Sequence, residues 1–124
     1  MKFTNTDKAP AALGPYSQAV AVNGLLFTSG QIALDPATGE VVGTNVQEQA
    51  EQVMKNLGAV LEANGLTYTD AEKTTCFLAD MNDFAAFNEI YGKYFTAKPA
   101  RSCVAVKTLP KNMLCEVEVI AEMK

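Results

Sequence analysis

The segment from Val46 to Asn64 carries the strongest structural pattern in this sequence. Its apolar residues recur every three or four positions and so form one stripe of a helix: Val46, Ala50, Val53, Met54, Leu57, Val60 and Leu61. Asn45 occupies the expected N-cap position, Glu48 resembles the second member of a capping box, and Gly65 suits the end of the helix. A helix with one apolar face must bury it against another element, so this segment predicts a layered fold.

Shorter patterns predict the elements around this helix. Asn23-Gly24 separates two apolar runs and is a strong hairpin signal. A second amphipathic helix is expected from Asp83 to Phe95, with Phe84, Phe87, Ile90, Tyr91 and Tyr94 on its apolar side. Strands are expected at Ala19–Val22, Leu25–Ser29, Ala71–Leu78, Arg101–Val106 and Leu114–Ala121, the last two as a pair.

The order ββ-α-β-α-ββ favours an α+β fold, in which two helices pack on one face of a mixed sheet. With 124 residues, the chain is expected to form one domain, residues 1–124. No third helix is predicted to cover the other sheet face. The economical cover is another copy of the chain, so we expect a homo-oligomer.

Composition narrows the possible functions. No apolar run approaches the roughly 18 residues that would cross a membrane, and no signal-peptide core follows Met1. Three cysteines without a CxxC pair suggest neither disulfides nor a zinc site and fit the cytoplasm. A net charge of -4 disfavours nucleic acid as a partner.

The chain contains no histidine, which removes a Ser/His/Asp triad and His-ligated zinc from consideration. Proton transfer must then depend on Glu, Asp, Cys, Tyr, Lys or water. If the last two strands pair, alternation brings Arg101 and Cys103 to the same surface as Glu116. An arginine fork binds a carboxylate in bidentate fashion, and a nearby carboxylate can activate a water.

The same residues also have ordinary structural interpretations. Glu116 can simply face water, Arg101 can be a solvated edge residue, and Cys103 can be a small buried hydrophobe. Tyr16 follows a Gly-Pro turn and Ser29-Gly30 ends a strand, where glycine permits close approach of a ligand or of backbone. Loop packing and a tight turn explain these features equally well.

Six stretches, in order and spanning nearly the whole chain, resemble the reactive intermediate deaminase (Rid) family, also called the YjgF family. They are Gly14–Val20, Thr28–Ile32, Lys73–Thr75, Asp80–Phe84, Pro99–Val104 and Leu109–Lys111. The resemblance implies a chorismate-mutase-like α+β fold, a homotrimer whose sheets form a central barrel, and a pocket at each subunit interface. It also implies 2-iminobutanoate/2-iminopropanoate deaminase activity, the hydrolysis of imines and enamines such as 2-aminoacrylate to 2-keto acids and ammonia.

Site roles follow from the same resemblance. It implies that Arg101 clamps the substrate carboxylate, Glu116 activates water, and Cys103 contributes mainly its backbone. The substrate-binding set would be Tyr16, Ser29, Gly30, Phe87, Asn88 and Arg101, with no metal and no cofactor. Competing interpretations are a non-catalytic module that binds keto acids or regulates a partner, and a ribonuclease. The short stretch before Pro99 could alter the rim of the pocket.

Overall fold

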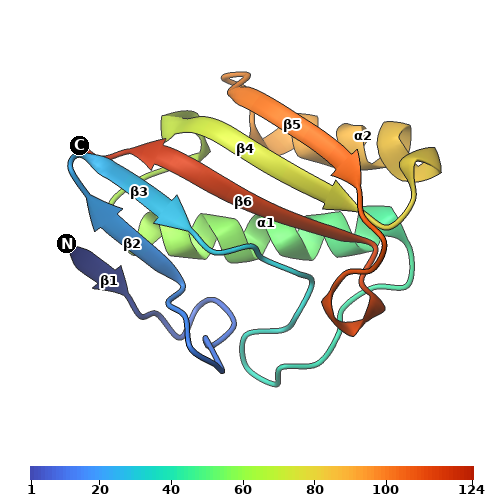
Figure 1. Cartoon of the computed structure of the whole chain (residues 1–124), viewed down its shortest axis with the longest axis horizontal. Coiled ribbons are helices and arrows are strands. Elements are labelled where there is room, and N and C mark those ends of the chain that lie inside the picture. The colour runs from blue at the N-terminus through green and yellow to red at the C-terminus, as the bar shows by residue number, and fades with distance from the viewer.

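A computed structural model describes residues 1–124, and its elements follow the predicted order with one added strand at the N-terminus. A six-stranded sheet is arranged in the order β1-β2-β3-β6-β4-β5 (Figure 1). The helices are α1 (Val46–Glu62) and α2 (Phe84–Tyr94). The strands are β1 (Lys2–Thr4), β2 (Ala19–Val22), β3 (Leu25–Thr28), β4 (Ala71–Leu78), β5 (Ala100–Ala105) and β6 (Cys115–Glu122).

The predicted hairpin and the limits of α1 have clear local causes. Asn23 and Gly24 both adopt positive φ, 52° and 79°, as the tight turn between β2 and β3 requires. The Asn45 side chain accepts a hydrogen bond from the backbone N–H of Glu48 at 2.9 Å, which confirms the N-cap. In a capping box the Glu48 carboxylate would accept from the backbone N–H of Asn45, but its hydrogen bond is with the N–H of Thr44. Helix α1 ends at Glu62, two residues before the predicted limit.

Both helices cover one face of the sheet, as predicted, and the core lies between these layers (Figure 1). Helix α1 buries its whole predicted stripe against alternate residues of β6, namely Cys115, Val117, Val119 and Ala121. From α2 the core receives Phe87, Ile90 and Tyr91. Neither helix is long and apolar enough to cross a membrane.

The predicted pairing of the last two strands is wrong. Strand β6 lies between β3 and β4 and is antiparallel to both, whereas β5 pairs with β4 in parallel at the sheet edge. Helix α2 supplies the crossover that a parallel pair needs. A strand with four fully buried side chains can satisfy both rows of backbone hydrogen-bonding groups only inside the sheet, and this favours the central place for β6.

The second face of the sheet has no helix over it. Register places Phe27 beside Ile120 and Phe77 beside Glu116 on this face, and Val104 lies next to Phe77. Phe3, Phe27 and Val104 are 60%, 39% and 48% exposed. An apolar surface of this kind is typical of a face that packs against another protein surface.

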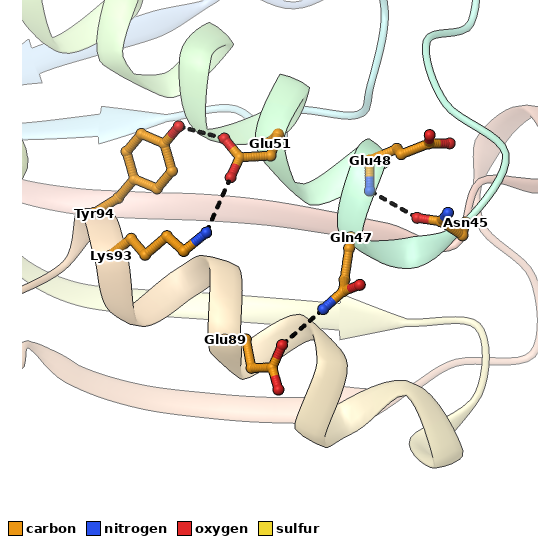
Figure 2. Close-up of polar contacts among 7 residues, drawn as sticks. All are labelled: Asn45, Gln47, Glu48, Glu51, Glu89, Lys93 and Tyr94. Carbon is orange, nitrogen blue, oxygen red and sulfur yellow. Dashed lines mark hydrogen bonds and ion pairs between the residues drawn. The ribbon is translucent and has the colours of Figure 1, made fainter.

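Polar contacts fix α2 against α1 at two levels (Figure 2). Glu51 on α1 accepts a hydrogen bond from the Tyr94 hydroxyl at 2.5 Å and lies 3.9 Å from the Lys93 ammonium. Near the start of α1, the Gln47 side-chain amide donates to Glu89 at 2.8 Å. These contacts join the two helices at points away from the Arg101 side chain.

We expect Tyr94→Phe to lower the free energy of unfolding by about 1 kcal/mol, because it removes the hydrogen bond to Glu51. That carboxylate raises the pKa of Tyr94 to about 12 from its ordinary value of 10.0. The bond therefore contributes fully below pH 10 and is lost as the pH rises towards 12. Denaturant titrations across this range measure the effect.

Tyr16→Phe is the matched control, because the Tyr16 side chain is 55% exposed and should change stability by less than about 0.5 kcal/mol. Equal losses in the two variants, or a Tyr94→Phe deficit that persists above pH 12, would contradict the assignment.

Candidate functional site

A cavity of about 430 Å³ lies where the N-terminal loop, the end of β3 and β6 meet. It brings together Tyr16, Ser29, Gly30 and Glu116, four of the residues predicted from the sequence. Seven further residues line it, and none of them was predicted as a site residue: Pro10, Ala11, Gln18, Gln31, Ile32, Leu34 and Pro110. Four of these, Gln18, Gln31, Ile32 and Pro110, lie within the stretches on which the family resemblance rests. Glu116 is the only ionisable carboxyl group in this wall, so the cavity presents a single acidic group among mainly neutral ones.

The buried side chain of Gln18 shapes this cavity by holding the N-terminal loop over it. Its oxygen accepts from the N–H of Thr6 at 2.7 Å, and its amide donates to the carbonyls of Thr6 and Pro10, both at 2.9 Å. The Ser29 hydroxyl donates to the Ser17 carbonyl at 2.5 Å and closes the other side. The loop is thus held by partly buried hydrogen bonds between side chains and backbone rather than by regular structure.

Glu116 lies against the backbone of Gly30, and only the lack of a side chain at Gly30 leaves room for the carboxylate. The adjoining residue Gln31 forms an antiparallel bridge with Val117, which holds the two segments together. Burial raises the pKa of Glu116, and the charge of Glu118 raises it further. A carboxyl group shifted in this direction is better suited to exchange protons with a substrate near neutral pH.

A second cavity of about 310 Å³ lies between α2 and the start of β5. Its residues are Asn88, Tyr91, Gly92, Phe95, Thr96, Lys98, Pro99 and Arg101. Two of them are cationic and none is acidic, so the cavity is electrostatically suited to an anion.

Arg101 is the only arginine in the chain, and neutral groups hold its guanidinium. Nη1 donates to the Asn88 side-chain oxygen at 2.7 Å, and Cζ lies 4.8 Å from the centre of the Tyr91 ring. The ring of Phe84 lies at 5.4 Å. The ion pairs of the chain are Lys93–Glu51 and Lys124–Asp70, so no carboxylate of the chain neutralises Arg101. Its charge and free N–H groups remain available to an anionic ligand.

The predicted common surface for Arg101 and Glu116 is wrong within one chain. Arg101 lies opposite Thr74 on the helix side of the sheet, whereas Glu116 lies opposite Phe77 on the open side. The error follows from the assumed pairing of β5 with β6. With β4 between them, the side on which each residue falls is set by two registers instead of one.

Two further residues differ from the predicted site. Phe87 has 0% exposure and belongs to the core, so its predicted contact with substrate is wrong. Cys103 lines neither cavity; it lies opposite Cys76 on the helix side of the sheet. Burial raises the pKa of the Cys103 thiol, although the nearby Arg101 charge opposes the shift. The protonated thiol is a poor nucleophile.

The contact of Arg101 with two aromatic rings was not predicted, although the spacing of residues on α2 indicates it. Phe84, Asn88 and Tyr91 are spaced i, i+4 and i+7 and therefore lie on one face of α2. The apolar stripe predicts only that Phe84 and Tyr91 are buried. In the structure Tyr91 is buried in the core and Phe84 packs against it, and the ring faces of both also meet the guanidinium.

The chain is a small α+β protein with one mixed sheet and two helices on one face. Its polar site is in two parts, an acidic cavity on the open side of the sheet and a cationic cavity on the helix side. Residues 6–123 match the family model described as Endoribonuclease L-PSP. The chain therefore belongs to this family, also called the YjgF or Rid family.

Relatives with different names support this membership. A Lactococcus lactis protein named as a candidate regulator, AldR, is 54% identical over 100% of this chain and 99% of its own length. The 2-iminobutanoate/2-iminopropanoate deaminase of Mus musculus is 50% identical over 97% and 90%. The crystal structure of E. coli TdcF with bound serine has a TM-score of 0.94, is 43% identical and matches over 100% of both chains.

We expect Gly30→Ala to push the Glu116 carboxylate out of its place while preserving the fold, because the added methyl group meets the end of a flexible side chain. In water the pKa of Glu116 should fall back towards its ordinary value of 4.5. A carbon-13 NMR titration of the carboxyl groups measures this change.

Gly92→Ala provides the control, since a methyl group there meets no atom within 4 Å. It should leave the Glu116 titration unaltered. An unchanged titration in Gly30→Ala would show that Gly30 does not determine where the carboxylate lies.

Proposed function

We propose that this chain is an imine/enamine deaminase, which hydrolyses 2-iminobutanoate, 2-iminopropanoate and enamines such as 2-aminoacrylate to 2-keto acids and ammonia. The observation that carries the proposal is the single arginine, half-buried, with no carboxylate partner, in a cavity without acidic groups. Such a group suits the carboxylate of an amino-acid-like substrate. The name of the mouse relative and the serine bound to TdcF agree with this substrate class.

One chain alone does not bring Arg101 and Glu116 together, so the proposal includes a homotrimer with a shared site. In it, Arg101 of one subunit and Glu116 of the next face the same cavity. The apolar residues of the open sheet face, among them Phe27 and Val104, supply the surface that the subunits would bury. Closed cyclic symmetry would then form three equal sites.

Hydrolysis in this site needs positioning and proton transfer. Arg101 binds the substrate carboxylate, and Glu116 accepts a proton from water as the water oxygen bonds to the imine carbon. Glu116 returns this proton to the nitrogen of the resulting carbinolamine. The C–N bond then breaks and ammonia leaves as the C=O bond forms, while the proton of the hydroxyl group passes to Glu116. The carbon of an imine protonated on nitrogen is already electrophilic, so the scheme uses no metal or cofactor. Asn88 orients Arg101, while Tyr16, Ser29, Gly30 and the backbone at Cys103 complete the proposed wall.

The main alternative is a module that binds 2-keto acids in the same cavity without catalysis and regulates a partner. The name of the Lactococcus lactis relative favours it. Ammonia release from enzymatically generated 2-aminoacrylate separates the two functions, since a regulator would bind ligand without raising the rate. An RNA-cleavage assay separates both from the ribonuclease named in the family description.

We expect Arg101→Ala to lower kcat/KM for ammonia release at least about a hundredfold, because the substrate loses its charge-assisted clamp. Arg101→Lys keeps the charge but not the fork and should recover only part of this loss. Lys107→Ala, an exposed cation removed from both cavities, is the control for charge. Full activity in Arg101→Ala would remove the proposed clamp.

Mixed oligomers test whether the site is shared between subunits. Arg101→Ala and Glu116→Ala subunits should each be inactive alone, because each lacks one half of every site. Random reassembly of equal amounts into trimers would rebuild one complete site in every mixed trimer and give about a quarter of wild-type activity. If both residues act within one chain, mixing restores nothing, and the shared site is rejected.

A further inference from the structure

The guanidinium of Arg101 lies over the ring of Tyr91, with 4.8 Å between Cζ and the ring centre. This contact is closer than the one to Phe84, at 5.4 Å. An arginine held by a carboxylate would lose part of its attraction for a substrate acid group. A ring face instead orients the flat cation while leaving its charge and its N–H edge free.

Tyr91 is itself fixed by contacts on its other sides. Its hydroxyl shares a buried hydrogen bond of 2.6 Å with the Thr74 hydroxyl on β4. Its ring stacks on Phe95, with centroids 4.8 Å apart and an interplanar angle of 29°. Burial raises the pKa of Tyr91, so the phenol stays neutral when it faces the cation.

Thr74, Tyr91 and Arg101 form a closed circuit through three elements. Thr74 lies opposite Arg101 in the parallel ladder between β4 and β5, and Tyr91 on α2 contacts both residues. A shift of the ring would therefore break its hydrogen bond to Thr74 or its contact with Arg101. The guanidinium plane is therefore oriented by a ring that is itself anchored in the core.

We propose that Tyr91 is a positioning residue for Arg101, and that its hydrogen bond to Thr74 sets the plane in which the guanidinium presents its fork to a carboxylate. The inference rests on the proposed function for its substrate, a 2-imino acid. It assigns the pair a part in substrate affinity: without the ring, Arg101 would sample orientations that do not match the carboxylate. The chemical step at Glu116 should be little affected.

The single arginine makes this proposal directly observable. Arg101 gives the only arginine Nε–H signal in a nitrogen-15 NMR spectrum, and the Tyr91 ring current should displace it from its ordinary position. Titration of the intact protein with 2-oxobutanoate, the keto-acid product, gives a Kd from the same signal. Steady-state kinetics on enzymatically generated 2-iminobutanoate gives KM and kcat.

Three variants divide the contribution of the ring from that of its hydroxyl. Tyr91→Leu removes the aromatic face and should raise KM and Kd about tenfold with kcat within about twofold. Tyr91→Phe keeps the face and should raise both only about two- to threefold. Thr74→Val should match Tyr91→Phe, and the double variant should be no worse than either, because the two changes remove one shared hydrogen bond.

Tyr94→Phe is the matched control, because it loses a tyrosine hydrogen bond on the same helix without touching Arg101. It should destabilise the chain yet leave the Arg101 signal, KM and Kd as in the wild type. The Arg101 signal should keep its displaced position in Tyr91→Phe and lose it in Tyr91→Leu. This difference would distinguish positioning of Arg101 by the ring from a general loosening of α2.

Two outcomes would overturn the inference, and they bear differently on the proposed function. If wild-type protein releases ammonia and Tyr91→Leu keeps its KM and its Arg101 signal, Tyr91 has no positioning role while the deaminase assignment stands. If wild-type protein neither releases ammonia nor binds 2-oxobutanoate, both proposals fail. Binding without turnover, weakened in Tyr91→Leu, would retain the positioning role and support the alternative of a keto-acid-binding module.

Discussion

Strand β6 organises this molecule because it lies inside the sheet and is hydrogen-bonded on both edges. Its alternate residues, from Cys115 to Ala121, form the floor under α1, and the residue between the first two of them is Glu116. The same period of two thus determines the core and the direction of the acidic group. A shift of β6 by one residue in its register would turn Glu116 towards the core and the apolar residues towards the open face. The burial of those apolar residues therefore fixes the position of Glu116.

The two cavities follow from different kinds of structure. Glu116 stands on a strand inside the sheet, and its cavity is completed by a loop held through Gln18. Arg101 stands on an edge strand, and its cavity is completed by the side chains of α2. One cavity therefore depends on hydrogen bonds between the Gln18 side chain and loop backbone, and the other on aromatic packing, although both would serve one reaction in the proposed trimer.

Local features of this fold could be predicted from the sequence, whereas pairings between distant segments could not. The Asn45 cap, the Asn23-Gly24 turn and the stripe ending at Leu61 each act within a few residues, so their patterns are complete in the sequence. The place of β6 depends on strands some 40 to 100 residues away, as Cys76 with Val117 and Leu25 with Glu122 show. Nearness along the chain led to the wrong pairing of β5 with β6.

The site shows the same division. Tyr16, Ser29, Gly30 and Glu116 share a cavity, as do Asn88 and Arg101, so residue identities carried much of the information. Periodicity could not tell Phe87, which lines neither cavity, from Tyr91, which is also buried but faces Arg101, since both fall on the apolar stripe of α2.

The placement of Arg101 and Glu116 on opposite faces has a consequence for a newly made chain. A lone subunit would hold an anion-binding half and a proton-accepting half that cannot reach the same molecule. Dilution that separates the subunits of the proposed trimer would then abolish the activity without unfolding the chain. With the proposed shared site, its specific activity would rise with its own abundance by mass action, so that the proposed hydrolysis of imines would begin only once enough partners had been synthesised.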